Sequence, residues 1–349
     1  MNIYDVSKKA GVSITTVSRV INGSDKVSEA TRRRVLAVIE ESGYTPNAFA
    51  RGLGLDTMHT VGILMVDPSD PNACASFTQS LGSLQRELRR YNFDSVLYCV
   101  GYDMRDKAET LRVMCARRLD AVIILGSFFI ENNPKDNQCI VEAARLMPVF
   151  LINGSLDAEN VYSFLCDDRQ SACDATAALI ASGCRRILFL HQGDSLSERR
   201  KREGYCDALA RAGLAADGAL VRTCPLGINE GANFVEALAR DLSFDAVLAT
   251  EDTIAMSVLK YANRNRIAVP EEISLIGYNN TLLAECCHPT LSTVDNNTEA
   301  ACVMAVSALM QVLRGVKTPA RTTVSSELVF RQSTRPVPTD PYFPPTGVK

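Results

Sequence analysis

The chain has 349 residues, which is too long for one ordinary domain and suits two or three. With 46% hydrophobic residues, 22% charged residues and a net charge of −3, its composition is that of an ordinary soluble globular protein. No apolar run approaches the roughly 18–20 residues that span a bilayer. The chain begins on a polar helical pattern instead of a secretory signal peptide. We therefore expect a cytoplasmic protein with no membrane partner.

Residues 2–23 predict two short helices separated at Gly11-Val12. Asn2 is placed to cap the first helix and Ser13 the second, because a side-chain oxygen can accept the unpaired amides of a first turn. Two such helices joined by a tight turn are typical of the helix-turn-helix motif, whose second helix lies in the DNA major groove. The exposed face of the second helix would carry small polar and basic residues and no acid: Ile14, Thr15, Ser18 and Arg19.

A third helix is predicted to follow Ser28, which can cap it. Arg32, Arg33 and Arg34 lie near its start, where basic charge opposes the helix dipole. Two interpretations stay open for them: proximity to phosphate, and an ordinary solvated face. Residues 1–55 hold eight Lys and Arg against five Asp and Glu, whereas the remainder holds 29 against 35. A basic head on an acidic body fits a DNA-binding module attached to a second kind of domain.

From Thr60 onward, short apolar runs alternate with amphipathic helical patterns. Runs of Val, Ile and Leu with little alternation indicate strands buried on both faces, and strand–helix alternation indicates parallel, doubly wound sheets. There are too many units for one sheet, so we expect two such subdomains, with a ligand cleft at the carboxyl ends of their strands. Strands are predicted at 60–66, 95–100, 121–125, 149–153, 185–191, 245–250 and 273–278. Helices are predicted near 76–91, 104–117, 137–146, 170–182, 198–212, 229–240 and 252–266.

The sequence contains none of the glycine-rich phosphate-binding or nucleophile motifs that mark common enzymes on such folds. The 12 cysteines form no CxxC pair, and most are interpreted as small buried apolar residues, as for Cys99, Cys115 and Cys302. Cys286-Cys287-His288 is not interpreted as a metal site, because adjacent side chains rarely converge on one ion. We therefore predict no catalytic residue, no metal and no cofactor.

Several segments resemble the lactose-repressor and purine-repressor (LacI) family of bacterial transcription regulators over about residues 2–335. Among them are IYDVSKKAGVSITTVSRVING, SGCRRILFL, VPEEISLIGYNN and HPTLSTVDNN. The resemblance implies an all-α head on a core of periplasmic-binding-protein type, which dimerises and binds a small effector, sugar or sugar-like, between its subdomains. The implied domains are a helix-turn-helix domain (1–45), a hinge helix and linker (46–59), the two-lobed core (60–334) and a disordered proline-rich tail (335–349).

The resemblance also implies which residues contact DNA. Arg19 would donate two hydrogen bonds to guanine O6 and N7. Base edges would be read by Ile14, Thr15 and Arg19, and phosphates contacted by Asn2, Ser13, Thr16 and Asn22. Residues 46–53 match the family's hinge helix, which is too short to be stable alone and is expected to order on DNA. In the minor groove it would place Asn47, Ala48, Arg51 and, as an apolar wedge, Leu53. A flexible linker is the alternative.

The effector cleft departs from the family's pattern. Asn72 and Ala73 stand where two ligand-stacking phenylalanines are common, so we expect those aromatic faces to be lost. Lys201 replaces an arginine, and lysine lacks the planar fork that clamps ligand oxygens. The implied effector-binding residues are Asp67, Asn72, Arg200, Lys201, Glu251, Asp252 and Asn279, although Asp252 could equally cap the helix that follows it.

The sequence therefore predicts a homodimeric regulator, favoured as a repressor, that binds palindromic double-stranded DNA and is controlled by a small molecule, favoured as a carbohydrate. Control by an inducer and control by a corepressor both stay open. The alternative is a solute-binding protein or an enzyme that uses the same two-lobed core and carries an inactive DNA head.

Overall fold

The computed structural model describes residues 2–21, 26–43, 58–69, 76–101 and 104–337. It divides into two compact units, residues 1–60 with 118–120 and the rest of the chain, and each is described by itself. The predicted hinge residues Asn47, Ala48, Arg51 and Leu53 lie outside the described residues, as do Asn22, Asn72 and most of the tail. The domain boundaries given above stay predictions.

The N-terminal unit contains α1 (Ile3–Ala10), α2 (Ile14–Ile21) and α3 (Glu29–Ser42). Asn2, Ser13 and Ser28 accept first-turn amides of these three helices, which confirms the predicted caps. Gly11 ends α1 in the left-handed conformation with φ 62°, which glycine adopts without steric cost. The three helices pack around a small core that comprises Val6, Ala10, Val17, Val20 and Val35.

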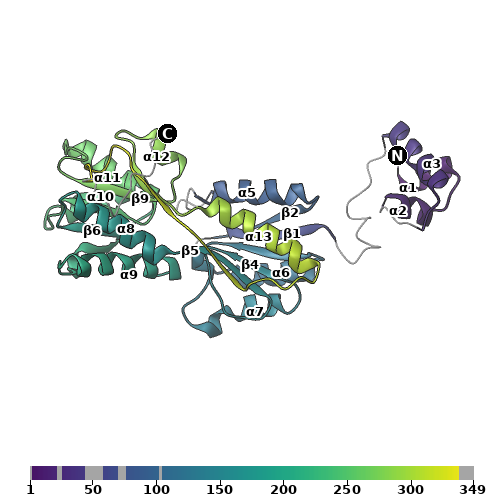
Figure 1. Ribbon diagram of the computed structural model, residues 1–349, viewed down its shortest axis with the longest axis horizontal. Coiled ribbons are helices and arrows are strands. Elements are labelled where there is room, and N and C mark those ends of the chain that lie inside the picture. The colour runs from purple at the N-terminus through teal and green to yellow at the C-terminus, as the bar shows by residue number, and fades with distance from the viewer. Residues whose placement is uncertain (1, 22–25, 44–57, 70–75, 102–103, 338–349) are drawn as a thin grey trace. The chain divides into compact units, whose positions relative to one another are not determined.

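In the first lobe of the second unit, a six-stranded sheet has the order β11-β5-β4-β3-β1-β2. Its strands are β1 (Thr60–Val66), β2 (Asp94–Val100), β3 (Ala121–Leu125), β4 (Val149–Ile152), β5 (Val161–Cys166) and β11 (Arg321–Val324). Its helices are α5 (Ser76–Arg90), α6 (Lys107–Ala116), α7 (Gln138–Ala144) and α13 (Thr298–Leu313). Figure 1 shows α5 and α13 side by side, and α6 packs beside α7.

The second lobe is built on a sheet with the order β12-β10-β9-β8-β6-β7. Its strands are β6 (Ile187–His191), β7 (Val221–Thr223), β8 (Ala246–Ala249), β9 (Ser274–Tyr278), β10 (Ser292–Asp295) and β12 (Glu327–Val329). Its helices are α8 (Asp168–Ala181), α9 (Leu196–Arg211), α10 (Ile228–Leu238), α11 (Asp252–Asn265) and α12 (Leu282–Cys286). Two apolar cores form where α8 with α9, and α10 with α11, pack on the strands.

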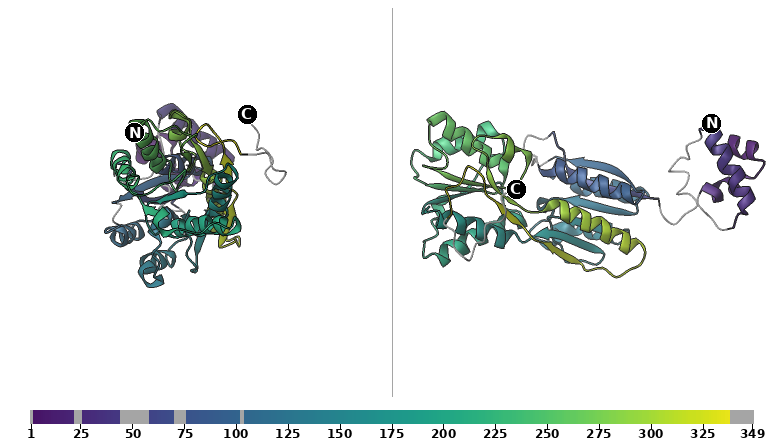
Figure 2. Two further views of the ribbon diagram at one scale, coloured as in Figure 1. Left: turned by 90° about the vertical axis from the view of Figure 1, so that its left-hand side faces the viewer. Right: turned by 45° about the horizontal axis from the view of Figure 1, so that its top comes forward.

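The prediction of two doubly wound subdomains is confirmed. The pairs from β11 to β1 in the first sheet and from β10 to β7 in the second are parallel, whereas β12 pairs antiparallel with β10. The chain passes between the lobes after β5, after β10 and after β11, since α13 and β11 return to the first lobe and β12 belongs to the second. The two lobes and their connecting segments can be followed in the turned view of Figure 2. Three connections constrain how the lobes can move relative to each other.

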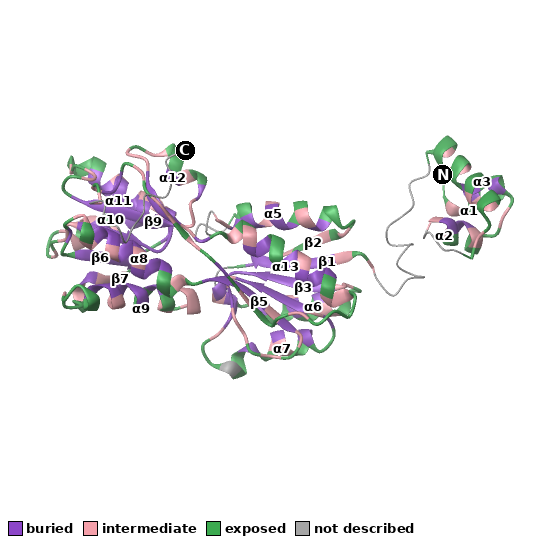
Figure 3. Ribbon diagram, viewed as in Figure 1, coloured by how far each residue is buried: buried purple, intermediate pink, exposed green. Residues whose placement is uncertain are grey.

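The interior strands are buried on both faces, as predicted, and Figure 3 shows this along both sheets. The prediction was wrong for β2, which lies at a sheet edge and buries only Val100. Cys99 is therefore exposed, although its apolar neighbours suggested a buried position, whereas Cys302 is buried as predicted. Among the described residues, no helix is long and apolar enough to cross a membrane.

Candidate functional site

The second helix of the N-terminal unit presents one face to its surroundings. Val17 and Val20 turn inward and hold α2 on the core. The three predicted base-reading residues Ile14, Thr15 and Arg19 are all exposed, and Ile14 retains 38% of its accessible surface. An apolar side chain left this accessible beside an exposed guanidinium suits contact with base edges, which offer both methyl groups and hydrogen-bond acceptors.

The predicted phosphate-contacting residues lie at the helix starts. The side-chain oxygen of Asn2 accepts the amides of Tyr4 (2.9 Å) and Asp5 (3.1 Å). Ser13 Oγ accepts the amide of Thr16 at 3.2 Å, and the two hydroxyls lie 2.9 Å apart. Helix N-termini carry partial positive charge and favour phosphate. Asn2, Ser13 and Thr16 lie at such helix starts, and phosphate contact by these three residues stays a prediction.

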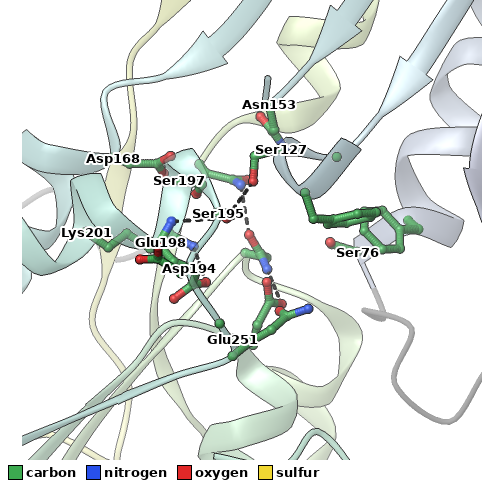
Figure 4. A pocket seen from close by; sticks show the side chains of 17 residues that line it. Ser76, Ser127, Asn153, Asp168, Asp194, Ser195, Ser197, Glu198, Lys201 and Glu251 are labelled. Carbon is green, nitrogen blue, oxygen red and sulfur yellow. Dashed lines mark hydrogen bonds and ion pairs between the residues drawn. The ribbon is translucent and has the colours of Figure 1, made fainter. Parts of the chain in front are cut away.

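The two lobes of the core enclose a pocket of about 110 Å³ where the carboxyl ends of their strands meet. From the first lobe come the start of α5 and the residues that follow β3 and β4. From the second lobe come the start of α8, the β6–α9 segment, and the residues after β8, β9 and β10. Figure 4 shows their side chains gathered around the pocket. The polar lining includes Ser127, Asn153, Asp168, Gln192, Ser195, Glu198, Lys201, Glu251, Asn279 and Asn296.

Two aromatic rings, Phe77 and Phe128, line the first-lobe side of this pocket with their centroids 5.5 Å apart at 72°. Aromatic faces therefore do line the pocket, although they come from α5 and from the segment after β3. Positions 72–73, where the two phenylalanines are absent, lie outside the described residues. Gly126 permits this arrangement, since it has φ 115° and a Cβ there would lie 2.5 Å from the Phe128 ring. The glycine directly after a buried strand was the available signal.

Lys201 and Glu198 lie three residues apart in α9, and both are buried pocket residues. Lys201 Nζ donates to the Thr250 carbonyl at 3.1 Å, lies 3.8 Å from Glu198 Oε1, and sits 3.9 Å from the centroid of the Tyr278 ring. Burial raises the pKa of the Glu198 carboxyl, and the Lys201 ammonium opposes that rise. Lys201 therefore lines the pocket, as predicted, and its neighbour there is the Glu198 carboxylate, which the sequence analysis did not identify.

Glu251 and Asn279 also line the pocket and are joined to each other. Asn279 Nδ2 donates to Glu251 Oε2 at 2.6 Å, and Asn296 Nδ2 donates to Asn279 Oδ1 at 2.8 Å. The backbone of Asn279 has φ 94°, in the left-handed region. This row of three side chains, contributed by the ends of three strands, presents amide and carboxylate groups suited to hydroxyl-bearing ligands.

Asp252 has a different environment. Its carboxylate accepts hydrogen bonds from Thr281 N (2.7 Å), Thr281 Oγ1 (2.8 Å) and Thr293 Oγ1 (2.7 Å). It is 1% exposed and is not among the residues that line the pocket. Asp252 is the first residue of α11 and does not cap it. Its contacts instead hold the segment after β9 and strand β10 itself against the start of α11.

Two further predicted effector-binding residues also lie away from the pocket lining. Asp67 accepts from the amide and hydroxyl of Ser69 at 2.8 and 2.7 Å, and Arg200 is exposed and pairs with Glu203 at 3.2 Å. Asp168, which is not predicted, does line the pocket and accepts the Tyr278 hydroxyl at 2.8 Å. The available signal for Asp168 was a pair of acids, Asp167 and Asp168, after a strand.

Direct contacts also connect the lobes beside the pocket. Ser127 Oγ and Ser195 Oγ lie 2.9 Å apart, and Asn132 Nδ2 donates to Asp194 Oδ2 at 3.3 Å. Arg199 donates to the side-chain oxygen of Asn132 as well. A ligand that enters between the lobes would alter the spacing across these bonds.

The fold and the site together define a protein with a helix-turn-helix head and a two-lobed ligand-binding core. Residues 2–47 match the family described as bacterial regulatory proteins, lacI family, and residues 176–334 match a periplasmic binding protein-like domain. An HTH-type transcriptional regulator of Lachnoclostridium phytofermentans is 44% identical over 335 residues, which cover 96% of this chain and 99% of the relative. The chain belongs to the lacI family of bacterial transcriptional regulators, which confirms the resemblance seen in the sequence.

Other relatives agree. The regulator GalR of Escherichia coli is 35% identical over 295 residues, which cover 84% of this chain and 83% of GalR. A complex of the regulator CelR with cellobiose is 26% identical, has a TM-score of 0.69, and covers 95% of this chain and 99% of its own. A lac repressor dimer bound to operator and the anti-inducer ONPF has a TM-score of 0.83 at 22% identity, and covers 96% and 99%. The last of these shows the shared fold.

Proposed function

We propose that this regulator is a cytoplasmic homodimeric repressor that binds a palindromic operator and is controlled by a sugar held between the lobes of its core. One observation carries the proposal: a pocket at the carboxyl ends of both sheets, with aromatic rings on one side and amide and carboxylate groups around it. Aromatic rings pack on the apolar faces of a sugar, and polar groups that converge on the pocket orient its hydroxyls. The cellobiose complex of the similar regulator CelR supports this choice of ligand.

The physical basis of control is the pair of lobes. A sugar that contacts both Phe77 on one side and Glu251 on the other favours one separation of the lobes, and so shifts the population of their arrangements. The three segments that connect the lobes carry that change through the core. In a dimer, it would alter the spacing of the two DNA heads.

The DNA head would read the operator through Ile14, Thr15 and Arg19, which are the exposed residues of α2. The proposed minor-groove contacts of Asn47, Ala48, Arg51 and Leu53 lie outside the described residues. A lac repressor dimer bound to operator, which shares the fold, supports dimeric operator binding. A solute-binding protein or an enzyme with an inactive head is not favoured, because the named relatives are transcriptional regulators.

The proposal is tested by measuring operator affinity of the full-length protein with and without added glucose, galactose and cellobiose. A sugar effector is expected to change the affinity at least about tenfold, within the usual range of allosteric coupling. A lowered affinity identifies an inducer and a raised affinity a corepressor. The same affinity with every sugar, at concentrations up to tens of millimolar, would contradict the proposed ligand class.

A further inference from the structure

The pocket has an uneven charge balance. Among the residues that the structure describes, its lining holds four carboxylates, Asp168, Asp194, Glu198 and Glu251, and one ammonium, Lys201. Of the acids, Asp194 is offset by arginines outside the lining, since its carboxylate lies 3.6 Å from Arg199 and 4.0 Å from Arg202. The remaining three acids still outnumber the lysine. An anionic ligand would therefore enter a site of its own sign.

The lysine is also occupied by the protein. Its Nζ donates to the Thr250 carbonyl at 3.1 Å and lies 3.8 Å from Glu198 Oε1. The same ammonium sits 3.9 Å from the centroid of the Tyr278 ring, within the range of a cation–π contact. A phosphate group would have to draw Lys201 away from these contacts. It would also approach Glu198, because the two residues occupy the same face of α9.

Glu198 has an unused acceptor. Its side chain is 6% exposed and its Oε1 faces Lys201. The Thr250 side chain and the Gln192 backbone lie close enough to the carboxyl to lower its pKa, but Oε2 makes no hydrogen bond of normal geometry within the part of the chain that the structure describes. A buried carboxylate oxygen without a donor is costly, and a donor from a bound molecule removes that cost. A sugar hydroxyl or ammonium group can supply the donor, whereas a phosphate dianion cannot.

We propose that the effector is a sugar without anionic groups, and that Glu198 determines this specificity by accepting a hydrogen bond from the ligand and repelling phosphorylated or carboxylated sugars. This inference rests on the proposed function, because it concerns the sugar in the same pocket. Glu198 acts with Asp168 and Glu251, which extend the negative charge across the second-lobe side of the pocket.

The test is calorimetric titration of the full-length protein with glucose, galactose and cellobiose, and with glucose 6-phosphate and galactose 6-phosphate. We expect at least one uncharged sugar to bind, and each 6-phosphate to bind at least about tenfold more weakly than its parent sugar, because like charges brought together in a pocket are costly. The wild-type comparison needs no variant to fold.

The variant Glu198→Gln tests the residue itself, since it keeps the shape of the side chain and removes its charge. We expect the preference for the uncharged sugar over its 6-phosphate to narrow by about threefold or more. Glu203→Gln is the matched control, because it makes the same charge change on an exposed residue of α9 that does not line the pocket. Its preference should equal that of the wild type.

Each outcome separates the hypotheses. A 6-phosphate that binds more tightly than its parent sugar would overturn this inference and leave a sugar effector in place. An unchanged preference in Glu198→Gln would overturn the role of Glu198. No binding by any sugar would overturn both the proposed effector class and the inference that rests on it.

Discussion

The variant Gly204→Ala tests how closely α8 and α9 approach beneath the pocket. Gly204 lies inside α9, where helix propensity alone predicts that alanine would stabilise the protein by about 1 kcal/mol. The structure predicts the opposite sign. A Cβ at Gly204 would lie 1.9 Å from the Arg169 carbonyl oxygen and 2.9 Å from the backbone nitrogen of Cys173, both in α8.

The magnitude follows from what must move. Nonbonded heavy atoms prefer a separation of about 3.5 Å, so α8 and α9 would have to move apart locally by about 1.5 Å. Both neighbours are backbone atoms of a helix that also contributes Asp168 to the pocket, and they cannot rotate away. Overpacking costs about 1–3 kcal/mol, and backbone contact places this case near the upper end. When the gain in helix propensity is subtracted from this cost, we expect Gly204→Ala to lower the free energy of unfolding by about 2 kcal/mol.

The assay is urea-induced unfolding followed by circular dichroism, because the chain has no tryptophan. Gly82→Ala is the matched control. Gly82 also lies inside a helix, α5, and a Cβ there would meet nothing within 4 Å. The free energy of unfolding of this variant should therefore rise by up to about 1 kcal/mol. If Gly204→Ala were as stable as Gly82→Ala, the close approach of α8 and α9 would be refuted.

Three further variants test separate parts of the structure. Arg19→Ala should lose preference among DNA sequences and keep weak, salt-sensitive binding, measured by competition at several salt concentrations; retained preference would contradict the role assigned to α2. Lys201→Ala should weaken the effect of sugar on operator affinity, because it removes the ammonium that lies 3.8 Å from Glu198 Oε1 in the pocket, and should leave the affinity itself intact. A full response would show that Lys201 does not contribute to the site. Asp252→Ala should lower the free energy of unfolding in urea by about 3 kcal/mol, because it leaves the hydrogen-bond donors of Thr281 and Thr293 unpaired. Unaltered stability would show that these bonds contribute little.

Features set by nearby residues could be predicted from the sequence. The caps at Asn2, Ser13 and Ser28 depend on a side-chain oxygen and amides within three residues, so the chain itself specifies them. The interior strands were predictable for a similar reason, because their burial on both faces requires unbroken apolar runs.

Features set by distant residues could not be predicted. The apolar run of β2 does not indicate that β2 is an edge strand, since strand order is fixed by packing between segments far apart in the chain. The return of α13 and β11 to the first lobe is likewise a property of the whole fold. The edge position of β2 leaves Cys99 exposed, whereas Cys302 is buried in helix α13.

The site shows the same division. Lys201, Glu251 and Asn279, inferred from the family resemblance, do line the pocket. Asp67 and Arg200 lie near matching motifs but make their contacts with Ser69 and Glu203 instead. Phe77, Phe128, Asp168 and Glu198 come from four different segments, and only the folded lobes bring them together.

The central claim is that this chain is a dimeric, sequence-specific DNA reader, and selection of bound duplexes from a random pool by the purified full-length protein tests it most directly. The account predicts enrichment of one palindrome with a flexible central step, as two symmetry-related heads require. Enrichment of no sequence, at low and at physiological salt and with the uncharged sugars present or absent, would contradict it.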